Sequence, residues 1–163
     1  GVYPDHPLAQ YFTTGMLRTE QTMEIIYGSR PHGVIEKLQE INFVEFEMQT
    51  YEDLKDKEDF NKWLSGDDNS KAPPGGESID EFNVRVGEGF EELKVQHELH
   101  VLKLRNQQEC PMTICVCHGG VISGVLKYLW PEECDNFFDW IPDPGHGYII
   151  DMEDGKITGR RKF

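Results

Sequence analysis

The sequence predicts an α/β fold in which a central mixed, mostly parallel sheet is flanked by helices to form three layers. Short β-prone runs alternate with stretches of helical periodicity along the chain. One such run covers residues 9–15 and another covers 113–117, and each leads directly into a helical pattern. The segment 147–160 reads as a hairpin that turns at Asp154-Gly155. Strands that alternate with helices favour a sheet covered by helices.

The length and composition suit a single soluble domain over residues 1–163. A chain of 163 residues can bury about 70% of the surface that its unfolded form exposes. No segment approaches the ~18 apolar residues of a membrane span, and no basic-then-apolar leader is present, so we expect a cytoplasmic location. The formal net charge of −14 argues against nucleic acids and anionic membranes as partners.

The helices are predicted from apolar periodicity and from their end signals. Leu17, Met23, Ile26 and Tyr27 lie near one face of a helix that Gly28 closes. Ser78 and Glu81 form a capping box at the start of the longest helix. That helix carries one buried stripe, Ile79, Phe82, Val86, Phe90 and Leu93.

Other segments give weaker local signals. Residues 30–57 are mixed and loop-rich, with short helices expected near 50–56 and 59–64 and a loop over 65–76. Cys110-Pro111 should break the long helix before the 113–117 strand, and a further helix is expected over 121–130. We expect His97 and His100 to be exposed helix residues, not ligands. The stretch 97–106 could pack on a second subunit, so a homodimer is one arrangement that the sequence allows.

The strand–glycine–helix stretch "TICVCHGGVISGVL" is the strongest candidate site. His118 ends the strand and is followed by Gly119 and Gly120, where open α/β sheets bind ligands. The free N–H groups of a helix start suit a phosphate, and a histidine there can hydrogen-bond a phosphoryl oxygen or act as nucleophile.

Two further residues could serve the same phosphoryl group. Arg18 lies in the first turn of the helix that follows the 9–15 strand, where its guanidinium could bind a phosphate, although a surface ion pair is the plainer interpretation. Glu40 could protonate a leaving oxygen if burial or the bound anion raised its pKa. With thirty Asp and Glu residues in the chain, spacing alone does not single it out.

The cysteines offer a metal-binding alternative. Cys115, Cys117, His118 and Cys134 could form a zinc site, but no C-x-x-C pair is present. Reduced cysteines, Cys110 included, are the favoured interpretation, and no metal or cofactor is expected.

Taken together, these stretches resemble the histidine phosphatase superfamily, which includes the cofactor-dependent phosphoglycerate mutases. The resemblance runs in order through four motifs, "YFTTGMLRTEQTMEII", "LQEINFVEFEMQTYEDL", "PPGGESIDEFNVRV" and "TICVCHGGVI". The short chain and the "PPGGES" context are most similar to the small broad-specificity phosphatases. The resemblance implies a phosphoglycerate mutase-like fold, with Arg18 as a phosphate-binding arginine, Glu40 as proton donor, His118 as second histidine and Gly119 as the glycine that follows it.

One family motif has no counterpart. The family opens with a strand that ends in Arg-His-Gly, whose histidine becomes phosphorylated, and this chain lacks it. His6 in "PDHPL" has neither the arginine nor the glycine beside it. Removing an interior strand leaves unpaired backbone groups on its two neighbours, so we expect an N-terminally incomplete histidine phosphatase-like domain.

The resemblance implies metal-independent hydrolysis of a small phosphorylated metabolite through a phosphohistidine, with the nucleophile in the missing segment. Two alternatives remain open within it. A pseudophosphatase would bind phosphate esters without turnover, and a mutase would transfer the phosphoryl group to another hydroxyl.

Overall fold

A computed structural model describes residues 3–41, 56, 72, 76–106, 110–133 and 137–163. The helices expected near 50–56 and 59–64, and nearly all of the 65–76 loop, lie outside the described residues. Among the helices described, none combines the length and the apolar character that crossing a membrane requires.

Among the described residues, three parallel strands form the central sheet, in the order β2-β1-β3. The two predicted strands are β1 (Gln10–Thr13) and β3 (Thr113–Val116), and all four residues of each are paired between them. The short strand β2 (Gly33–Val34), which the sequence did not indicate, pairs with the carboxyl end of β1. The carboxyl ends of the three strands therefore lie side by side, at the same end of the sheet.

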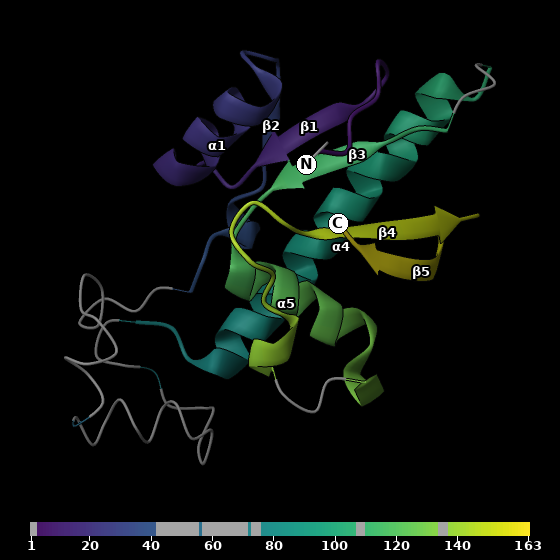
Figure 1. The fold of residues 1–163 in the computed structure, drawn as a ribbon. Coiled ribbons are helices and arrows are strands. Elements are labelled where there is room, and N and C mark those ends of the chain that lie inside the picture. Colours follow the sequence, from purple (N-terminus) through teal and green to yellow (C-terminus); the bar gives the residue numbers. More distant parts are fainter. Residues whose placement is uncertain (1–2, 42–55, 57–71, 73–75, 107–109, 134–136) are drawn as a thin grey trace.

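Helices cover both faces of this sheet, which confirms the expected α/β layering (Figure 1). On one face, Tyr11 of β1 packs against Tyr27 of α1 (Leu17–Tyr27), with 5.2 Å between ring centroids. On the other face, Phe12 joins the main core with Phe82 and Val86 of α4 (Ile79–Leu104) and Val121 of α5 (Gly119–Leu129). Adjacent strand residues point to opposite faces, so β1 contributes to both layers.

The long helix α4 forms as predicted. Ser78 accepts a hydrogen bond from Glu81 N–H, and the Glu81 side chain accepts one from Ser78 N–H, which completes the capping box. The predicted stripe faces the core, with Phe82, Val86 and Phe90 buried. Three short 3₁₀ turns complete the helical elements of the described residues: η1 (Glu36–Leu38), η3 (Pro131–Glu133) and η4 (Phe137–Trp140).

His97 and His100 are not the exposed helix residues that we expected. Both are half-buried: His97 Nδ1 lies 2.8 Å from Thr113 Oγ1, and His100 Nε2 lies 2.6 Å from the Leu8 carbonyl oxygen. The end of α4 packs along the amino ends of β1 and β3, so these imidazoles find polar partners there. The α5 helix also starts two residues earlier than predicted, directly after His118.

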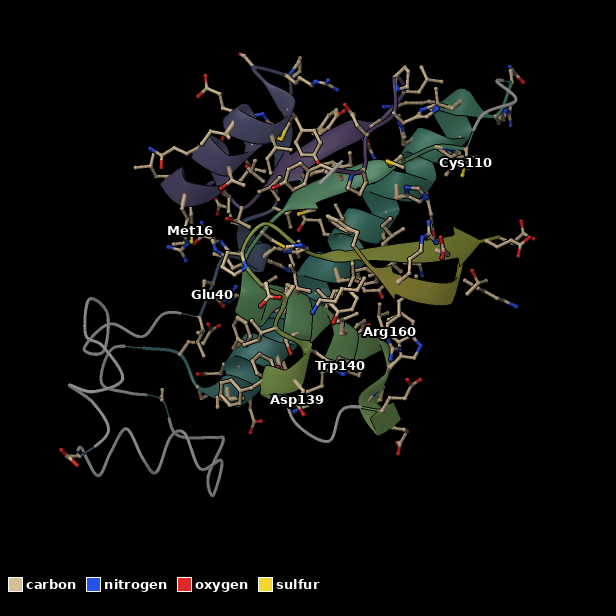
Figure 2. All side chains as sticks on the ribbon, viewed as in Figure 1. Met16, Glu40, Cys110, Asp139, Trp140 and Arg160 are labelled. Atoms are coloured by element: carbon tan, nitrogen blue, oxygen red, sulfur yellow. The ribbon has the colours of Figure 1, made fainter. Side chains whose placement is uncertain are left out.

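The C-terminal hairpin forms a second sheet, separate from the parallel one. Strands β4 (Tyr148–Glu153) and β5 (Lys156–Lys162) pair in antiparallel fashion, and Asp154 and Gly155 turn with φ of 49° and 74°, as the Asp-Gly signal predicts. Arg160 of β5 lies over the rings of Trp130 and Trp140, at 4.4 and 4.8 Å from their centroids (Figure 2). It also forms a 2.7 Å ion pair with Glu133, so these contacts attach the hairpin to the segment after α5.

Candidate active site

The candidate site lies where β1 and β3 end. Thr13 and Val116 are paired in the register of these strands, so the residues that follow them come close together. Thr14 continues from β1, and His118 is the N-cap residue of α5. Their side chains meet at 2.9 Å between Thr14 Oγ1 and His118 Nε2, and both residues are buried.

Arg18 reaches the same histidine from the first turn of α1. Gly15, with φ of 76°, turns the chain from β1 toward this helix. Arg18 Nε donates a 2.9 Å hydrogen bond to His118 Nδ1. The residue is otherwise exposed, and within the described part of the chain its terminal guanidinium nitrogens have no protein partner. The structure therefore brings together two residues that lie a hundred positions apart.

The hydrogen bonds around His118 define its tautomer. Arg18 can only donate, so His118 Nδ1 must be an unprotonated acceptor. Thr19 Oγ1 donates to the Met16 carbonyl and therefore accepts from Thr14 Oγ1, 3.1 Å away. The Thr14 hydroxyl proton is thereby used, so His118 Nε2–H donates to Thr14. The contact with Arg18 and the contact with Thr14 therefore indicate the same tautomer, a neutral imidazole protonated on Nε2.

The environment also disfavours the imidazolium form. Burial, and after it the positive charge of Arg18, lowers the pKa of His118 to about 4. At neutral pH the ring is thus uncharged. A bound dianion would change this balance, because a negative charge beside the ring favours its protonation.

Glu40 lies near the amino end of α5, just after η1. Its carboxylate accepts hydrogen bonds from Gly120 N–H at 3.2 Å and from Ile41 N–H at 3.1 Å. Burial is the largest influence on this carboxyl and raises its pKa, against the lowering effect of the two N–H groups and of Arg18. A group with these properties can exchange a proton with an oxygen atom at the site.

Gly119 and Gly120 have different local roles. A Cβ added at Gly120 would lie 2.5 Å from Glu40 Oε1, so the carboxylate can reach the helix end only because this residue is glycine. A Cβ at Gly119, the glycine singled out from the sequence, would instead lie 2.9 Å from Ile141 Cγ2. The absence of a side chain at Gly119 thus allows Ile141, which directly follows η4, to lie close to it.

Two residues that the sequence analysis missed hold the Glu40 segment in place. Gln39 Nε2 donates to the Thr14 carbonyl at 3.1 Å. Arg85 of α4 donates to the carbonyls of Lys37 and Gln39, at 2.8 and 2.9 Å, and binds both carboxylate oxygens of Glu77. The acceptors along this segment are backbone carbonyls, which leave no mark in a sequence. The hydroxyl of Thr14 was noted only as part of a turn rich in small hydroxylated residues.

Figure 2 shows at which end of the strands the candidate site lies. Glu40 and Met16 lie toward one end of the strands, and Cys110 lies at the other. In the part of the chain that the structure describes, no hydrogen bond joins Glu40 directly to Arg18 or His118. The carboxyl is connected to the histidine through the first turn of α5.

The described residues contain no group of three or more His, Cys, Asp or Glu side chains placed to hold a metal ion. Of the four residues in the zinc alternative, Cys134 lies outside the described residues. The pKa of Cys115 is raised, first by its hydrogen bond with Cys117 and then by burial, which keeps the thiol protonated in this structure.

A comparison with protein families matches residues 2–162 to the model of the histidine phosphatase superfamily (branch 1). A curated relative, the adenosylcobalamin/α-ribazole phosphatase of Salmonella typhi, is 24% identical over 156 residues, which cover 93% of this chain and 71% of the relative.

Solved structures share the fold. A protein from Escherichia coli, considered to be an α-ribazole-5′-P phosphatase, superposes with a TM-score of 0.65 at 23% identity, over 92% of this chain and 70% of that one. YhfR from Bacillus stearothermophilus gives a TM-score of 0.62 at 20% identity, over 93% and 72% of the two chains.

Proposed function

The chain belongs to the histidine phosphatase superfamily, and on this premise we propose that it is the body of a phosphate monoester hydrolase that uses a phosphohistidine. In this proposal residues 1–163 form one N-terminally incomplete domain, and the nucleophilic histidine belongs to a segment that precedes them. The reaction needs no metal, and the substrate is a small phosphorylated metabolite.

The observation that carries the proposal is the convergence of Arg18 and His118 at the ends of two adjacent strands. A guanidinium and an imidazole within 2.9 Å of each other can share the oxygens of one phosphoryl group. Arg18 is also exposed, which leaves its terminal nitrogens accessible to an incoming anion. These are the groups that stabilise the charge on the equatorial oxygens during phosphoryl transfer.

Phosphate binding in this site would rearrange the network. Arg18 Nε now occupies the Nδ1 lone pair of His118, so the ring cannot donate from Nδ1 to a ligand. A phosphate dianion that draws the guanidinium to itself would release Nδ1 and favour its protonation. His118 would then be an imidazolium that donates a hydrogen bond to a phosphoryl oxygen, and binding would be coupled to the uptake of a proton.

Glu40 supplies the proton transfers in both half-reactions. In the first, a histidine nitrogen forms a bond to phosphorus, the bond from phosphorus to the ester oxygen breaks, and Glu40 gives its proton to that oxygen. In the second, water attacks the phosphorus of the phosphohistidine while Glu40 takes a proton from the water. The bond from phosphorus to nitrogen breaks, which releases orthophosphate and regenerates the free histidine. A carboxyl whose pKa is raised by burial suits both directions of transfer.

The comparisons support phosphatase activity, which is the general part of this proposal, because the curated relative is named a phosphatase. The identities are too low to transfer a particular substrate. A second candidate function, a module that binds phosphate esters without turnover, is favoured by one observation. Among the described residues, His118 is the only histidine in the hydrogen-bond network of the site.

Hydrolysis and binding can be tested separately. The 163-residue chain and the full product of its gene would each be assayed with p-nitrophenyl phosphate in excess EDTA, and orthophosphate binding would be measured by calorimetry. We expect both proteins to bind orthophosphate and only the longer one to turn over, with an acid-labile phosphoenzyme trapped by rapid quench. His118→Ala should weaken binding in both, whereas His146→Ala, in an exposed loop, serves as the matched control.

Three results would contradict parts of the proposal. Hydrolysis by the 163-residue chain itself would place the nucleophile within it. Orthophosphate binding without turnover by the longer protein would support the non-catalytic module. Absence of orthophosphate binding in both proteins would remove the phosphate site altogether.

A further inference from the structure

Arg85 is a half-buried arginine of α4 to which the proposed reaction gives no part. Its Nε and Nη2 donate to the two carboxylate oxygens of Glu77, each at 2.6 Å. Its Nη1 donates to the backbone carbonyls of Lys37 and Gln39, at 2.8 and 2.9 Å. One guanidinium thus connects the residue that precedes the capping box of α4 to the segment that leads into Glu40.

These contacts distinguish Arg85 from Arg18. A guanidinium has five N–H bonds, and Arg85 directs four of them at protein acceptors. Its Cζ also lies 5.3 Å from the centre of the Phe82 ring. A guanidinium committed in this way is not available to a phosphoryl group, whereas the terminal nitrogens of Arg18 are exposed. Arg85 can therefore act on the site only through the residues that it holds.

The carbonyl of Gln39 belongs to the peptide bond that joins this residue to Glu40. Because a peptide unit is planar, a hydrogen bond to this carbonyl orients the backbone from which the Glu40 side chain departs. The side chain of Gln39 donates to the Thr14 carbonyl at 3.1 Å, so residue 39 is held both to α4 and to the end of β1. From this fixed backbone, the Glu40 carboxylate accepts from Gly120 N–H.

Glu77 fixes the orientation of Arg85. The two side chains are 26% and 17% exposed, for Arg85 and Glu77 respectively, and they form two hydrogen bonds. Such a paired contact holds a guanidinium in one orientation, which a lysine ammonium cannot reproduce. The ion pair of Lys37 with Glu88 also joins η1 to α4, but it is much more exposed, and exposed pairs contribute little.

We propose that Arg85, with Glu77 as its counter-ion, is the positioning residue of the proton donor. It holds the peptide between Gln39 and Glu40 so that the Glu40 carboxyl lies buried at the start of α5. The effect of Arg85 on turnover rests on the proposed function, in which Glu40 protonates the leaving oxygen. Its effect on the location of Glu40 does not, and it can be measured in the 163-residue chain.

The pKa of Glu40 distinguishes positioning from a simple effect of charge. Burial raises this pKa, and the positive charge of Arg85 is among the influences that lower it. If Arg85 acted through its charge alone, Arg85→Gln would raise the pKa of Glu40 further. If Arg85 holds the carboxyl in place, the same change releases it to solvent, and its pKa falls toward the ordinary value of 4.5. We expect the fall.

The measurement is an NMR titration of the Glu40 carboxyl carbon and of the Gly120 amide proton. In the unaltered chain the Gly120 amide should follow the ionisation of Glu40, because it donates to that carboxylate. Arg85→Gln should abolish this response. Arg85→Lys keeps the charge but not the paired contact with Glu77, so it should give a smaller fall in the pKa of Glu40. The lysine variant also keeps the test available if Arg85→Gln does not fold.

Lys37→Gln is the matched control, because it removes the exposed ion pair between the same two elements. The control should leave the Glu40 and Gly120 titrations unchanged. The pKa of His118, about 4, should be the same in every variant, which would show that the rest of the site is intact. A rise in the pKa of Glu40 in Arg85→Gln, a retained Gly120 response, the same change in Lys37→Gln, or an altered pKa of His118 would each overturn the proposal.

Turnover by the longer protein separates this inference from the proposed function. Arg85→Gln should lower kcat for phenyl phosphate about 10-fold, with a much smaller effect for p-nitrophenyl phosphate, whose leaving group needs no proton. The KM should change by less than about twofold, because Arg85 does not contact the substrate. The alkaline limb of the kcat profile for phenyl phosphate should move to lower pH together with the pKa of Glu40.

A displaced Glu40 without any loss of kcat would leave the positioning role of Arg85 intact. That result would count against Glu40 as the proton donor of the proposed function. A lower kcat with Glu40 still in place would overturn the positioning role itself.

Discussion

His118 is held neutral by contacts that a bound phosphate would have to replace. Its Nδ1 accepts from Arg18, and its Nε2–H donates into a chain of threonine hydroxyls that ends at the Met16 carbonyl. The ring is buried and its orientation is fixed on both sides. In the proposed function, the protonation state of this one side chain would therefore report whether the site is empty or filled.

Replacing Arg18 with methionine should raise the pKa of His118. Burial is the larger cause of the lowered pKa and the arginine charge is the second, so the pKa should rise from about 4 but stay below the ordinary value of 6.5. NMR titration of the imidazole resonances measures this directly. Arg30→Met is the matched control, because Arg30 pairs with Asp5 and should leave His118 unchanged. An unaltered pKa in Arg18→Met would contradict the arrangement described.

The same residue predicts how the stability of the fold depends on pH. The pKa of His118 is about 4 in the folded state and about 6.5 in the unfolded state, so between these values the unfolded state binds the additional proton. The free energy of unfolding should fall as the pH drops through this window, by at most ~3 kcal/mol from this residue. Glu40 acts in the opposite direction, because its raised pKa favours the folded state in acid.

Urea denaturation at pH 7 and pH 5 tests this linkage. His118→Asn should reduce the loss of stability between the two pH values, whatever its effect on absolute stability. Glu40 is present in both proteins, so its contribution cancels in the comparison. An equal loss in both proteins would show that other groups dominate the acid sensitivity.

At the scale of elements, two strand–turn–helix junctions build the site. One connects β1 to α1 and contributes Thr14 and Arg18, and the other connects β3 to α5 and contributes His118 and Gly120. Because β1 and β3 are adjacent and parallel, the junctions lie side by side. The segment after η1 brings Glu40 to the start of α5, where N–H groups and the helix dipole accept a carboxylate.

Gly120→Ala should displace Glu40 without unfolding α5. The added Cβ would lie 2.5 Å from Glu40 Oε1, so the carboxyl must leave the helix end. In the longer protein of the proposed function, kcat should fall about 10- to 100-fold for phenyl phosphate, which needs its leaving oxygen protonated. The loss should be much smaller for p-nitrophenyl phosphate, whose leaving group departs as an anion.

Gly159→Ala is the control for this change. Its added Cβ would lie 3.8 Å from Asp151 Oδ2, an ordinary contact in the hairpin, so neither substrate should be affected. Equal losses with both substrates in Gly120→Ala would indicate a general distortion of the site in place of a lost proton donor.

At the scale of the whole molecule, the negative charge opposes the approach of the ligand that the site would bind. The formal net charge is −14, whereas the site presents a guanidinium to the solvent. A phosphate is repelled at long range and attracted only within a few ångströms of Arg18. Salt screens the long-range part more strongly, because the close contact lies well inside the screening length.

Orthophosphate should therefore bind more tightly as salt is added at low ionic strength. Raising the ionic strength from about 0.01 M to about 0.15 M shortens the Debye length from ~30 to ~8 Å, and we expect the Kd to fall about twofold. Calorimetry in sodium gluconate avoids competition from chloride. A Kd that rises severalfold would mean that the local positive field extends further than the geometry indicates.

The main elements and the candidate residues were predictable because their signals are local. The capping box of Ser78 and Glu81, the apolar stripe of α4 and the Asp154-Gly155 turn each occupy a few neighbouring positions. His118 and Arg18 stand at strand–helix junctions, where parallel sheets gather their ligands. The resemblance to a family then singled out Glu40 among the many acids of the chain.

Four side chains make contacts that were not predictable, because each of them has at least one partner far away in the sequence: Arg85, Gln39, His97 and His100. Arg85 and Gln39 donate to backbone carbonyls, and His97 and His100 bind groups at the amino ends of the strands. Strand β2 has only two residues and is defined by its pairing with β1, so it has no periodicity of its own. Hydrogen bonds between distant segments leave no pattern in composition or spacing.

The sequence by itself determined the longer strands and helices of the described residues, because side-chain periodicity, caps and turn residues act within a few positions of one another. It also determined that Arg18 lies in the first turn of a helix and that His118 lies between a strand and a helix. Only the tertiary structure decided that the two residues touch, that His118 is neutral and that the pKa of Glu40 is raised. Only the tertiary structure shows that the hairpin forms a sheet separate from the parallel one, with a groove between β3 and β4. Burial, strand pairing and long-range hydrogen bonding are properties of the packed chain, so they exist only once distant segments have met.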